Sequence, residues 1–193
     1  MSGCTWHWVR HGPTHEKAFT GWRDVPADLS DTAAIARLSA ALPEEAILVA
    51  SDLARASATA DALGTSQQHR RRLPDSRALR EFDFGAWDGA TFDVVASRWP
   101  DLSRAYWEDP GPHAPPEGES WDAAAARVAA GVATLEAAHP RATFIAVAHL
   151  GVILTRFAAA AGLPPRKAIG QHIAPLSVTT LSPGSVQRIN HCP

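Results

Sequence analysis

The first residues that could carry chemistry form the run Arg10-His11-Gly12, at the end of a short apolar segment. An arginine side chain presents a fixed fork of N–H donors that fits phosphate oxygens, and the adjacent histidine offers a nucleophilic ring nitrogen. A glycine lets backbone amides come close to a ligand. The run indicates phosphoryl chemistry, but three residues carry little specificity, so the rest of the chain must decide the interpretation.

Four further blocks combine charged, polar and aromatic residues. They contain, in order, Arg55, Glu81, Glu119 and His149, and they cover residues 51–56, 79–89, 118–121 and 147–152. The first and the last of these blocks follow apolar segments that read as strands. Because α/β proteins place ligands at the carboxyl ends of strands, these are positions where an active site is expected.

With these blocks in this order, the sequence resembles the histidine phosphatase superfamily, the phosphoglycerate mutase-like proteins, from residue 5 to about residue 162. The resemblance implies that His11 becomes phosphorylated and that Glu81 protonates the leaving group. It implies that Arg10, Arg55 and His149 hold the phosphoryl oxygens. The substrate contacts it implies are those of Arg10, Gly12, Thr14, Thr20, Gly21, Arg55, His149 and Leu150.

One feature of the sequence separates a phosphatase from a mutase. A mutase must retain a doubly charged intermediate, which requires extra cations, and residues 90–95 after the Glu81 block contain no lysine or arginine. We therefore expect a metal-independent phosphomonoesterase that hydrolyses a small phosphorylated metabolite through a phosphohistidine, and not a mutase. Leu150, which stands where the family usually has glycine, narrows the space above His149 and bears on which substrates fit the pocket.

The substrate is less well defined. The block Phe84-Gly85-Ala86-Trp87 and the compact length are similar to those of the α-ribazole phosphatases, and specificity is expected in residues 99–117. Phosphoglycerate mutase-type transfer is the alternative reaction. A non-catalytic phosphate-binding protein is the alternative class, although binding alone requires no proton donor such as Glu81.

The charges expected around the site affect the two reacting side chains in different ways. The guanidinium groups of Arg10 and Arg55 should lower the pKa of His11 from its usual value of about 6.5, which keeps the nucleophile neutral. They should also lower the pKa of Glu81, although a proton donor must hold its proton. We expect the bound phosphate dianion to raise the pKa of Glu81 again.

Strand and helix patterns alternate along the sequence and predict an α/β fold, a three-layer sandwich with a central, mostly parallel sheet flanked by helices on both faces. We expect one domain over residues 1–193. Ser30 and Ser120 are the expected N-caps of the helices that follow them. Strands are predicted at residues 5–9, 46–50 and 144–148, with a hairpin over 178–181 and 186–189, and helices at 31–42, 53–63, 92–99, 102–108, 121–138 and 152–161.

Composition excludes several other classes of protein. The net charge of −2 argues against a nucleic-acid partner, and Arg70, Arg71 and Arg72 are expected on a solvated strand or loop edge. Segments long and apolar enough to cross a membrane are absent from the sequence, and no secretory signal pattern opens it, so we expect a cytoplasmic location without membrane contact. The oligomeric state stays open.

No metal or cofactor is expected. His7, His11 and His15 are spaced four apart, as on a metal-binding helix, but Gly12-Pro13 breaks any helix there. Cys4 and Cys192 lack the spacing of metal ligands or of a disulfide framework. The expected partner is a small-molecule phosphomonoester substrate.

Overall fold

A six-stranded sheet forms the centre of the computed structural model, which describes residues 3–64 and 69–193. The strand order is β3-β2-β4-β1-β5-β6. Strands β3, β2, β4 and β1 are parallel to one another, β5 is antiparallel to β1, and β6 is antiparallel to β5. The expectation of a mostly parallel sheet is confirmed. The strands are β1 (Thr5–Arg10), β2 (Ala46–Ala50), β3 (Arg70–Arg72), β4 (Thr143–Ala148), β5 (Val178–Ser182) and β6 (Ser185–His191).

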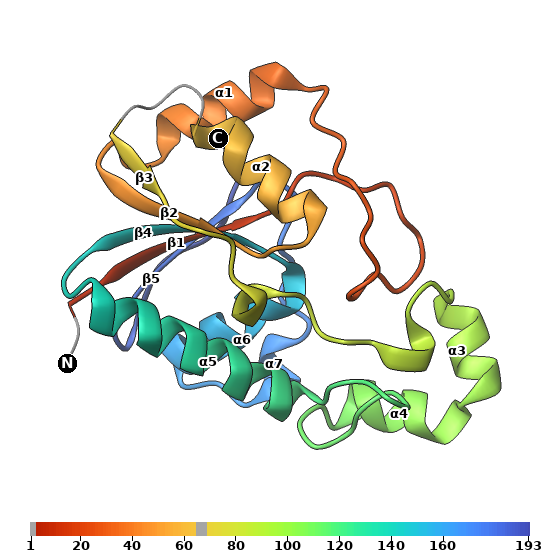
Figure 1. Ribbon diagram of the computed structural model, residues 1–193. Coiled ribbons are helices and arrows are strands. Elements are labelled where there is room, and N and C mark those ends of the chain that lie inside the picture. Colours follow the sequence, from red (N-terminus) through yellow and green to blue (C-terminus); the bar gives the residue numbers. More distant parts are fainter. Residues whose placement is uncertain (1–2, 65–68) are drawn as a thin grey trace.

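Helices cover both faces of this sheet, as predicted (Figure 1). Helices α1 and α2 lie on one face, whereas α5, α6 and α7 lie on the other; α3 and α4 form a projection beside the sandwich. The bounds are α1 (Thr32–Ala41), α2 (Ala54–Gly64), α3 (Phe92–Arg98), α4 (Pro100–Glu108), α5 (Trp121–Ala138), α6 (Leu150–Ala161) and α7 (Pro165–Ala168). Among the residues described, no helix is long and apolar enough to cross a bilayer.

The alternating side chains of β1 divide the core between the two faces of the sheet. Trp6 and Trp8 point to the side of α5 and α6, where they pack with Phe144. Val9 points to the other side and packs with residues of α1 and α2 such as Leu38. Because a strand alternates with period two, β1 contributes to both cores, which fixes the position of its carboxyl end.

Both ends of α5 and the carboxyl end of α6 agree with the sequence expectation, whereas α2, α3, α4 and the start of α6 differ from it by one or two residues. The Ser120 hydroxyl accepts from the N–H of Ala123 at the start of α5, and Gly162 ends α6 in the left-handed conformation. At α1, however, the N-cap is Asp31, whose carboxylate accepts from the N–H of Ala34. The prediction of Ser30 was one residue too early, because the cap side chain must reach the third N–H of the helix.

The three arginines at residues 70–72 were expected on a solvated strand or loop edge, and the structure agrees with this only in part. They form the edge strand β3, which pairs with β2 in the described part of the sheet. Arg71 is exposed, but Arg70 is only 6% exposed and points inward. Its guanidinium donates to the backbone carbonyls of Pro43, Ser39, Leu42 and Leu63. The expectation was therefore wrong for Arg70, because carbonyls at the ends of α1 and α2 require donors there.

Candidate active site

Two histidines lie together where the neighbouring strands β1 and β4 end. The strands pair in parallel, with Arg10 opposite Ala148, so the residues that follow them share one edge of the sheet. The backbone N–H of His11 donates to the carbonyl of Ala148 at 3.0 Å, and the ring centroids of His11 and His149 are 5.0 Å apart. The first and last sequence blocks thus meet at the carboxyl edge of the sheet.

The imidazole of His11 is buried and holds its proton on one defined nitrogen. Its Nδ1 lies 2.7 Å from the carbonyl oxygen of Gly12. Since a carbonyl can only accept, Nδ1 carries the proton and Nε2 keeps a lone pair. Burial and the charges of Arg55 and Arg10 outweigh the opposing effect of the Gly12 carbonyl and lower the pKa of His11 to about 3. The ring is therefore neutral at pH 7, as predicted.

His149 has the other tautomer. It is fully buried, and the Nε–H of Arg55 donates to its Nδ1 at 3.2 Å. The proton of a neutral ring must then lie on Nε2. Burial, followed by the effects of His11 and Arg55, lowers the pKa of His149 well below its usual value. The side chain is therefore a neutral hydrogen-bond donor through Nε2.

Two buried donors at this site lack an acceptor among the residues described. They are Nε2 of His149 and Nε of Arg10. The Nη1 of Arg10, in contrast, donates to the carbonyl of Ile173 at 2.6 Å. An unsatisfied buried donor costs about 1–3 kcal/mol, so a ligand that brings oxygen acceptors would recover this free energy. The site is thus suited to an oxyanion.

Arg55 is 1% exposed and serves mainly to position other groups. Besides His149, its guanidinium donates to the carbonyls of Arg23 at 3.0 Å, Gly21 at 2.7 Å and Thr20 at 3.4 Å. These contacts use four of the five N–H bonds of an arginine, which leaves one on Nη1 for a ligand. Arg55 therefore fixes the tautomer of His149 and fastens the loop after β1 to the start of α2.

The carboxylate of Glu81 lies at the amino end of α6. Its Oε1 accepts from the N–H groups of Phe82 at 3.0 Å and Gly151 at 3.1 Å, and Oε2 lies 3.2 Å from the same Gly151 nitrogen. Burial raises the pKa of Glu81, against the opposing effects of these hydrogen bonds and of Arg55 and Arg10. The predicted effect of the arginines is confirmed in direction, but burial outweighs it before any phosphate binds.

Arg127 of α5 holds the backbone that carries Glu81. Its Nη1 donates to the carbonyls of Ala78 at 2.9 Å and Arg80 at 3.0 Å, and its Nη2 donates to the carbonyl of Glu81 at 3.2 Å. Both oxygens of the Glu119 carboxylate accept from the same guanidinium, at 2.8 and 2.7 Å. One half-buried guanidinium thus fixes three carbonyls of the short segment that ends at Glu81.

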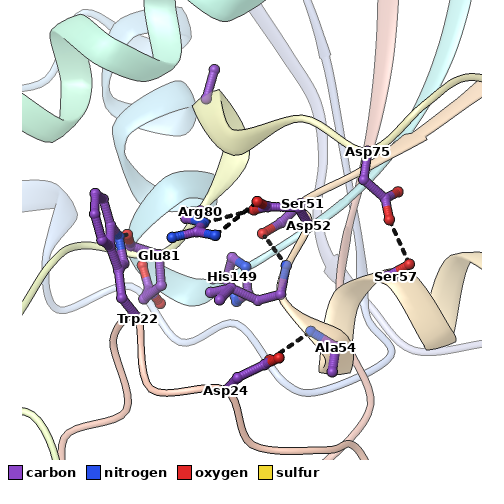
Figure 2. Close-up of polar contacts among 12 residues, drawn as sticks. Trp22, Asp24, Ser51, Asp52, Ala54, Ser57, Asp75, Arg80, Glu81 and His149 are labelled. Atoms are coloured by element: carbon purple, nitrogen blue, oxygen red, sulfur yellow. Dashed lines mark hydrogen bonds and ion pairs between the residues drawn. The ribbon is translucent and has the colours of Figure 1, made fainter.

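Trp22 supports Glu81 from the other side. Its indole N–H donates to the carbonyl of Glu81 at 2.8 Å, and Figure 2 shows the two side chains next to each other. The guanidinium of Arg80 lies 5.1 Å from the centre of the Trp22 ring and forms two hydrogen bonds with the carboxylate of Asp52, at 2.7 and 2.8 Å (Figure 2). The loop after β1, the segment of Glu81 and the end of β2 are therefore connected.

A cavity of about 260 Å³ opens over these groups. Seven of the residues predicted for the site line it: Arg10, His11, Thr14, Thr20, Arg55, Glu81 and Leu150. His149, whose ring centroid lies 5.0 Å from that of His11, is not among the lining residues. The other lining residues are Glu16, Lys17, Ala18, Phe19, Phe84, Phe92 and Trp107.

Neither of the two predicted glycines lies on the cavity wall. The N–H of Gly12 donates to the hydroxyl of Thr59 at 3.0 Å, and a Cβ on Gly12 would lie 2.6 Å from the side chain of Leu29. A Cβ on Gly21 would lie 2.6 Å from the carbonyl oxygen of Phe82. The structure therefore explains both glycines by close packing of the loop after β1.

Sequence reasoning missed three contributors to this geometry. Gly151, two residues after His149, supplies the N–H that holds Glu81, and its position in the same block was an available signal. Arg127 had no such signal, because an arginine in an alanine-rich helix is typical of a solvated face. Phe92 lay outside residues 99–117, where specificity was expected, whereas Trp107 lay within that range.

The three histidines spaced four apart have separate partners. His7 on β1 contacts the hydroxyl of Thr180 at 3.2 Å, and His15 pairs with Asp28 at 2.8 Å on the surface. His11 alone faces the cavity. In the part of the chain that the structure describes, no three residues of the metal-binding types lie close enough to share an ion.

One family model matches most of the chain. Residues 7–189 match the family model described as the histidine phosphatase superfamily (branch 1). Mycobacterial glucosyl-3-phosphoglycerate phosphatase, solved in complex with VO₃, is 28% identical and covers 97% of this chain and 98% of its own, with a TM-score of 0.84. YhfR of Bacillus stearothermophilus is 24% identical, covers 98% of both chains and has a TM-score of 0.85, so it shows the fold.

A curated relative matches over a shorter stretch. The bifunctional protein of Mycobacterium tuberculosis is 41% identical over 86 residues, which is 44% of this chain. The match spans 23% of that relative's length.

Proposed function

The chain belongs to the histidine phosphatase superfamily. On that basis we propose that it is a phosphatase, a metal-independent phosphomonoesterase that works through a phosphohistidine at Nε2 of His11. The observation that carries the proposal is the pair of histidine tautomers. The hydrogen bond to Gly12 leaves the Nε2 lone pair of His11 free, and the hydrogen bond from Arg55 leaves an N–H on His149 beside it.

The reaction proposed has two displacements. In the first, the Nε2 lone pair of His11 attacks phosphorus, the P–O bond to the alcohol breaks, and the Glu81 carboxyl gives its proton to the departing oxygen. In the second, a water molecule attacks the phosphohistidine, the P–N bond breaks, and the Glu81 carboxylate takes the proton of the water. His11 and Glu81 are then in their starting states, and the products are an alcohol and inorganic phosphate.

Fixed donors stabilise the charge on the transferred group in this scheme. Nε2–H of His149, Nε–H of Arg10 and the remaining N–H of Arg55 are the groups that we assign to the phosphoryl oxygens. They are buried and held before the substrate arrives, so little reorganisation is required during the reaction. Loss of one such donor typically lowers the rate by about 100-fold or more.

Burial prepares Glu81 for its role as a proton donor. Its raised pKa increases the fraction of protonated carboxyl near neutral pH, and a bound phosphate dianion would increase that fraction further. We propose a small phosphorylated metabolite as substrate, with α-ribazole phosphate as one member of the panel to be tested. One domain over residues 1–193 and a cytoplasmic location stay predictions.

The test is hydrolysis of a panel of phosphomonoesters at neutral pH, with and without a chelator. We expect turnover in both conditions, labelling of the enzyme by a ³²P-labelled substrate after rapid acid-free quenching, and loss of both in His11→Ala. The matched control is His15→Ala, four residues away on the surface, which should keep both. Dependence on a metal, or turnover without the label, would contradict the proposal. Transfer between phosphoglycerates that outpaces hydrolysis would favour a mutase.

A further inference from the structure

Two aromatic side chains on the wall of the cavity are unusually open to solvent. Phe92, the first residue of α3, is 54% exposed, and Trp107 of α4 is 43% exposed. Both line the same cavity as His11 and Glu81. An exposed group of large apolar side chains at a concave site is typical of a surface that a ligand covers.

These two rings rest on a rigid aromatic base. The ring centre of Phe19, which is 3% exposed, lies 4.6 Å from that of Phe92 and 6.2 Å from that of Trp107. Phe84 packs edge-on against Phe19 at 5.0 Å. Tyr106 packs edge-on against Trp107 at 5.1 Å. The open rings are therefore held in place by buried neighbours, as a binding surface requires.

Glu16 and Thr20, two of the polar residues that line the cavity, are engaged with protein groups. The carboxylate of Glu16 pairs with Arg23 at 2.7 Å. The hydroxyl of Thr20 donates to the carbonyl of Ala18 at 3.1 Å. A sugar rich in hydroxyl groups would have to displace these contacts, whereas a flat apolar ring needs none of them. Thr14 and Lys17 also line the cavity, so the preference for an apolar ligand body comes from the open rings of Phe92 and Trp107.

We propose that the substrate carries an aromatic ring close to its phosphate ester, and that this ring packs on Phe92 and Trp107 while the phosphoryl group lies at His11. The inference rests on the phosphatase function proposed above and names the class of its substrate. A cavity of about 260 Å³ lies near the lower limit for small-molecule sites and suits a phosphoryl group with a single ring system.

The test compares three esters of primary alcohols, so that the leaving groups differ little in basicity. They are phenethyl phosphate, cyclohexylethyl phosphate and glycerol phosphate. We expect the native enzyme to have the highest kcat/KM for the phenethyl ester, by about 10-fold or more over glycerol phosphate. The preference over the cyclohexyl ester should be about 3- to 10-fold, the usual effect of one aromatic contact.

Variants then locate the preference. Trp107→Ala and Phe92→Ala should each lower the ratio of phenethyl to glycerol kcat/KM by about 3- to 10-fold, and Trp107→Phe should restore most of it. Val94→Ala is the matched control, because Val94 is an exposed apolar residue of the same helix α3 that does not line the cavity. It should leave the ratio unchanged.

The outcomes separate the two proposals. If the esters are hydrolysed with dependence on His11 but the ratio is the same in native enzyme, Phe92→Ala and Trp107→Ala, the aromatic subsite is refuted and the phosphatase proposal stands. If none of the panel is hydrolysed, the proposed function fails as well. A preference for the cyclohexyl ester would show an apolar site that does not select for aromatic rings, and it would overturn the inference.

Discussion

The two histidines of the site differ in which ring nitrogen holds the proton, and one neighbour decides each case. The carbonyl of Gly12 can only accept a hydrogen bond, so it places the proton of His11 on Nδ1. The guanidinium of Arg55 can only donate, so it places the proton of His149 on Nε2. Two histidines, both uncharged, thus present a lone pair and an N–H respectively, which are the groups that we propose as nucleophile and hydrogen-bond donor.

The low pKa of His11 predicts that stability depends on pH. The unfolded chain binds a proton at His11 below about pH 6.5, whereas the folded chain does not until about pH 3. Stability due to this group is therefore complete above pH 6.5 and is lost as the pH falls, by about 1.4 kcal/mol per pH unit. Urea unfolding at pH 7 and pH 5 should show a smaller loss in His11→Gln than in the native protein.

His149 has the same sign of shift, so the variant should retain part of the dependence. An equal loss in His11→Gln and in the native chain would show that His11 is not buried in its neutral form.

The role proposed for Glu81 predicts a dependence on the leaving group. Glu81→Gln removes the acidic proton but keeps the size of the side chain. For alkyl phosphates, whose alcohols are poor leaving groups, kcat should fall by about 100-fold or more. For nitrophenyl phosphate, which leaves without protonation, formation of the phosphohistidine should hardly change. Rapid-quench measurement of that step with both esters is the test, and an equal loss for both would contradict proton donation by Glu81.

At the scale of elements, the amino end of α6 connects His149 with the carboxylate of Glu81. His149 precedes the helix, Leu150 begins it, and the N–H of Gly151 binds the carboxylate of Glu81. The partial positive charge of a helix amino end stabilises a negative carboxylate. Burial acts in the opposite direction and raises the pKa of Glu81. The balance allows Glu81 to exist in both of the states that the proposed reaction requires.

This arrangement predicts that Gly151→Ala impairs catalysis. A Cβ at Gly151 would lie 2.6 Å from Oε1 of Glu81 and 2.9 Å from the ring of Phe82, so the carboxylate must move. A displacement of about 1 Å typically costs about 100-fold in rate. The unfolding free energy should fall as well, by about 1–3 kcal/mol, because the Cβ also crowds the buried ring of Phe82, so kcat is measured well below the unfolding midpoint.

The measurement is kcat for an alkyl phosphate together with the urea midpoint. Gly170→Ala is the control, since a Cβ there meets no atom within 4 Å, and it should leave both values unchanged. If Gly151→Ala keeps the native kcat, contact between the helix end and Glu81 is not required for turnover.

The sequence allowed the regular elements and the reacting side chains to be predicted, but not the contacts that position them. Strand β2 and helix α5 were found with their observed bounds, because apolar runs and helical periodicity are local signals. The segment around Glu81 consists of two short 3₁₀ turns, Arg77–Leu79 and Gly85–Trp87, which carry no periodic signal. The hydrogen bond between the Arg127 guanidinium and the carbonyl of Glu81 joins residues 46 positions apart, which only the folded chain brings together.

At the scale of the whole molecule, the carboxyl ends and the amino ends of the parallel strands have different roles. The carboxyl ends of β1 and β4 carry the histidines of the site. The amino end of β3 carries Arg70, whose buried guanidinium donates to carbonyls at the ends of α1 and α2. Since the two regions lie at opposite edges of the sheet, a change at Arg70 should affect stability and leave catalysis unaltered.

Arg70→Met tests this separation. The substitution keeps most of the apolar stem but leaves several buried carbonyls without donors, so we expect a loss of about 3 kcal/mol and a fall in Tm of about 6–12 °C. Arg71→Met is the matched control, because Arg71 is the exposed neighbour on the same strand, and its Tm should change by only about 1–2 °C. The kcat of the folded fraction, measured well below Tm, should be native in both variants.

Two outcomes would contradict this prediction. A native Tm in Arg70→Met would show that the carbonyls at the ends of α1 and α2 do not depend on this guanidinium. A reduced kcat with native KM would show that the two ends of the parallel strands are coupled.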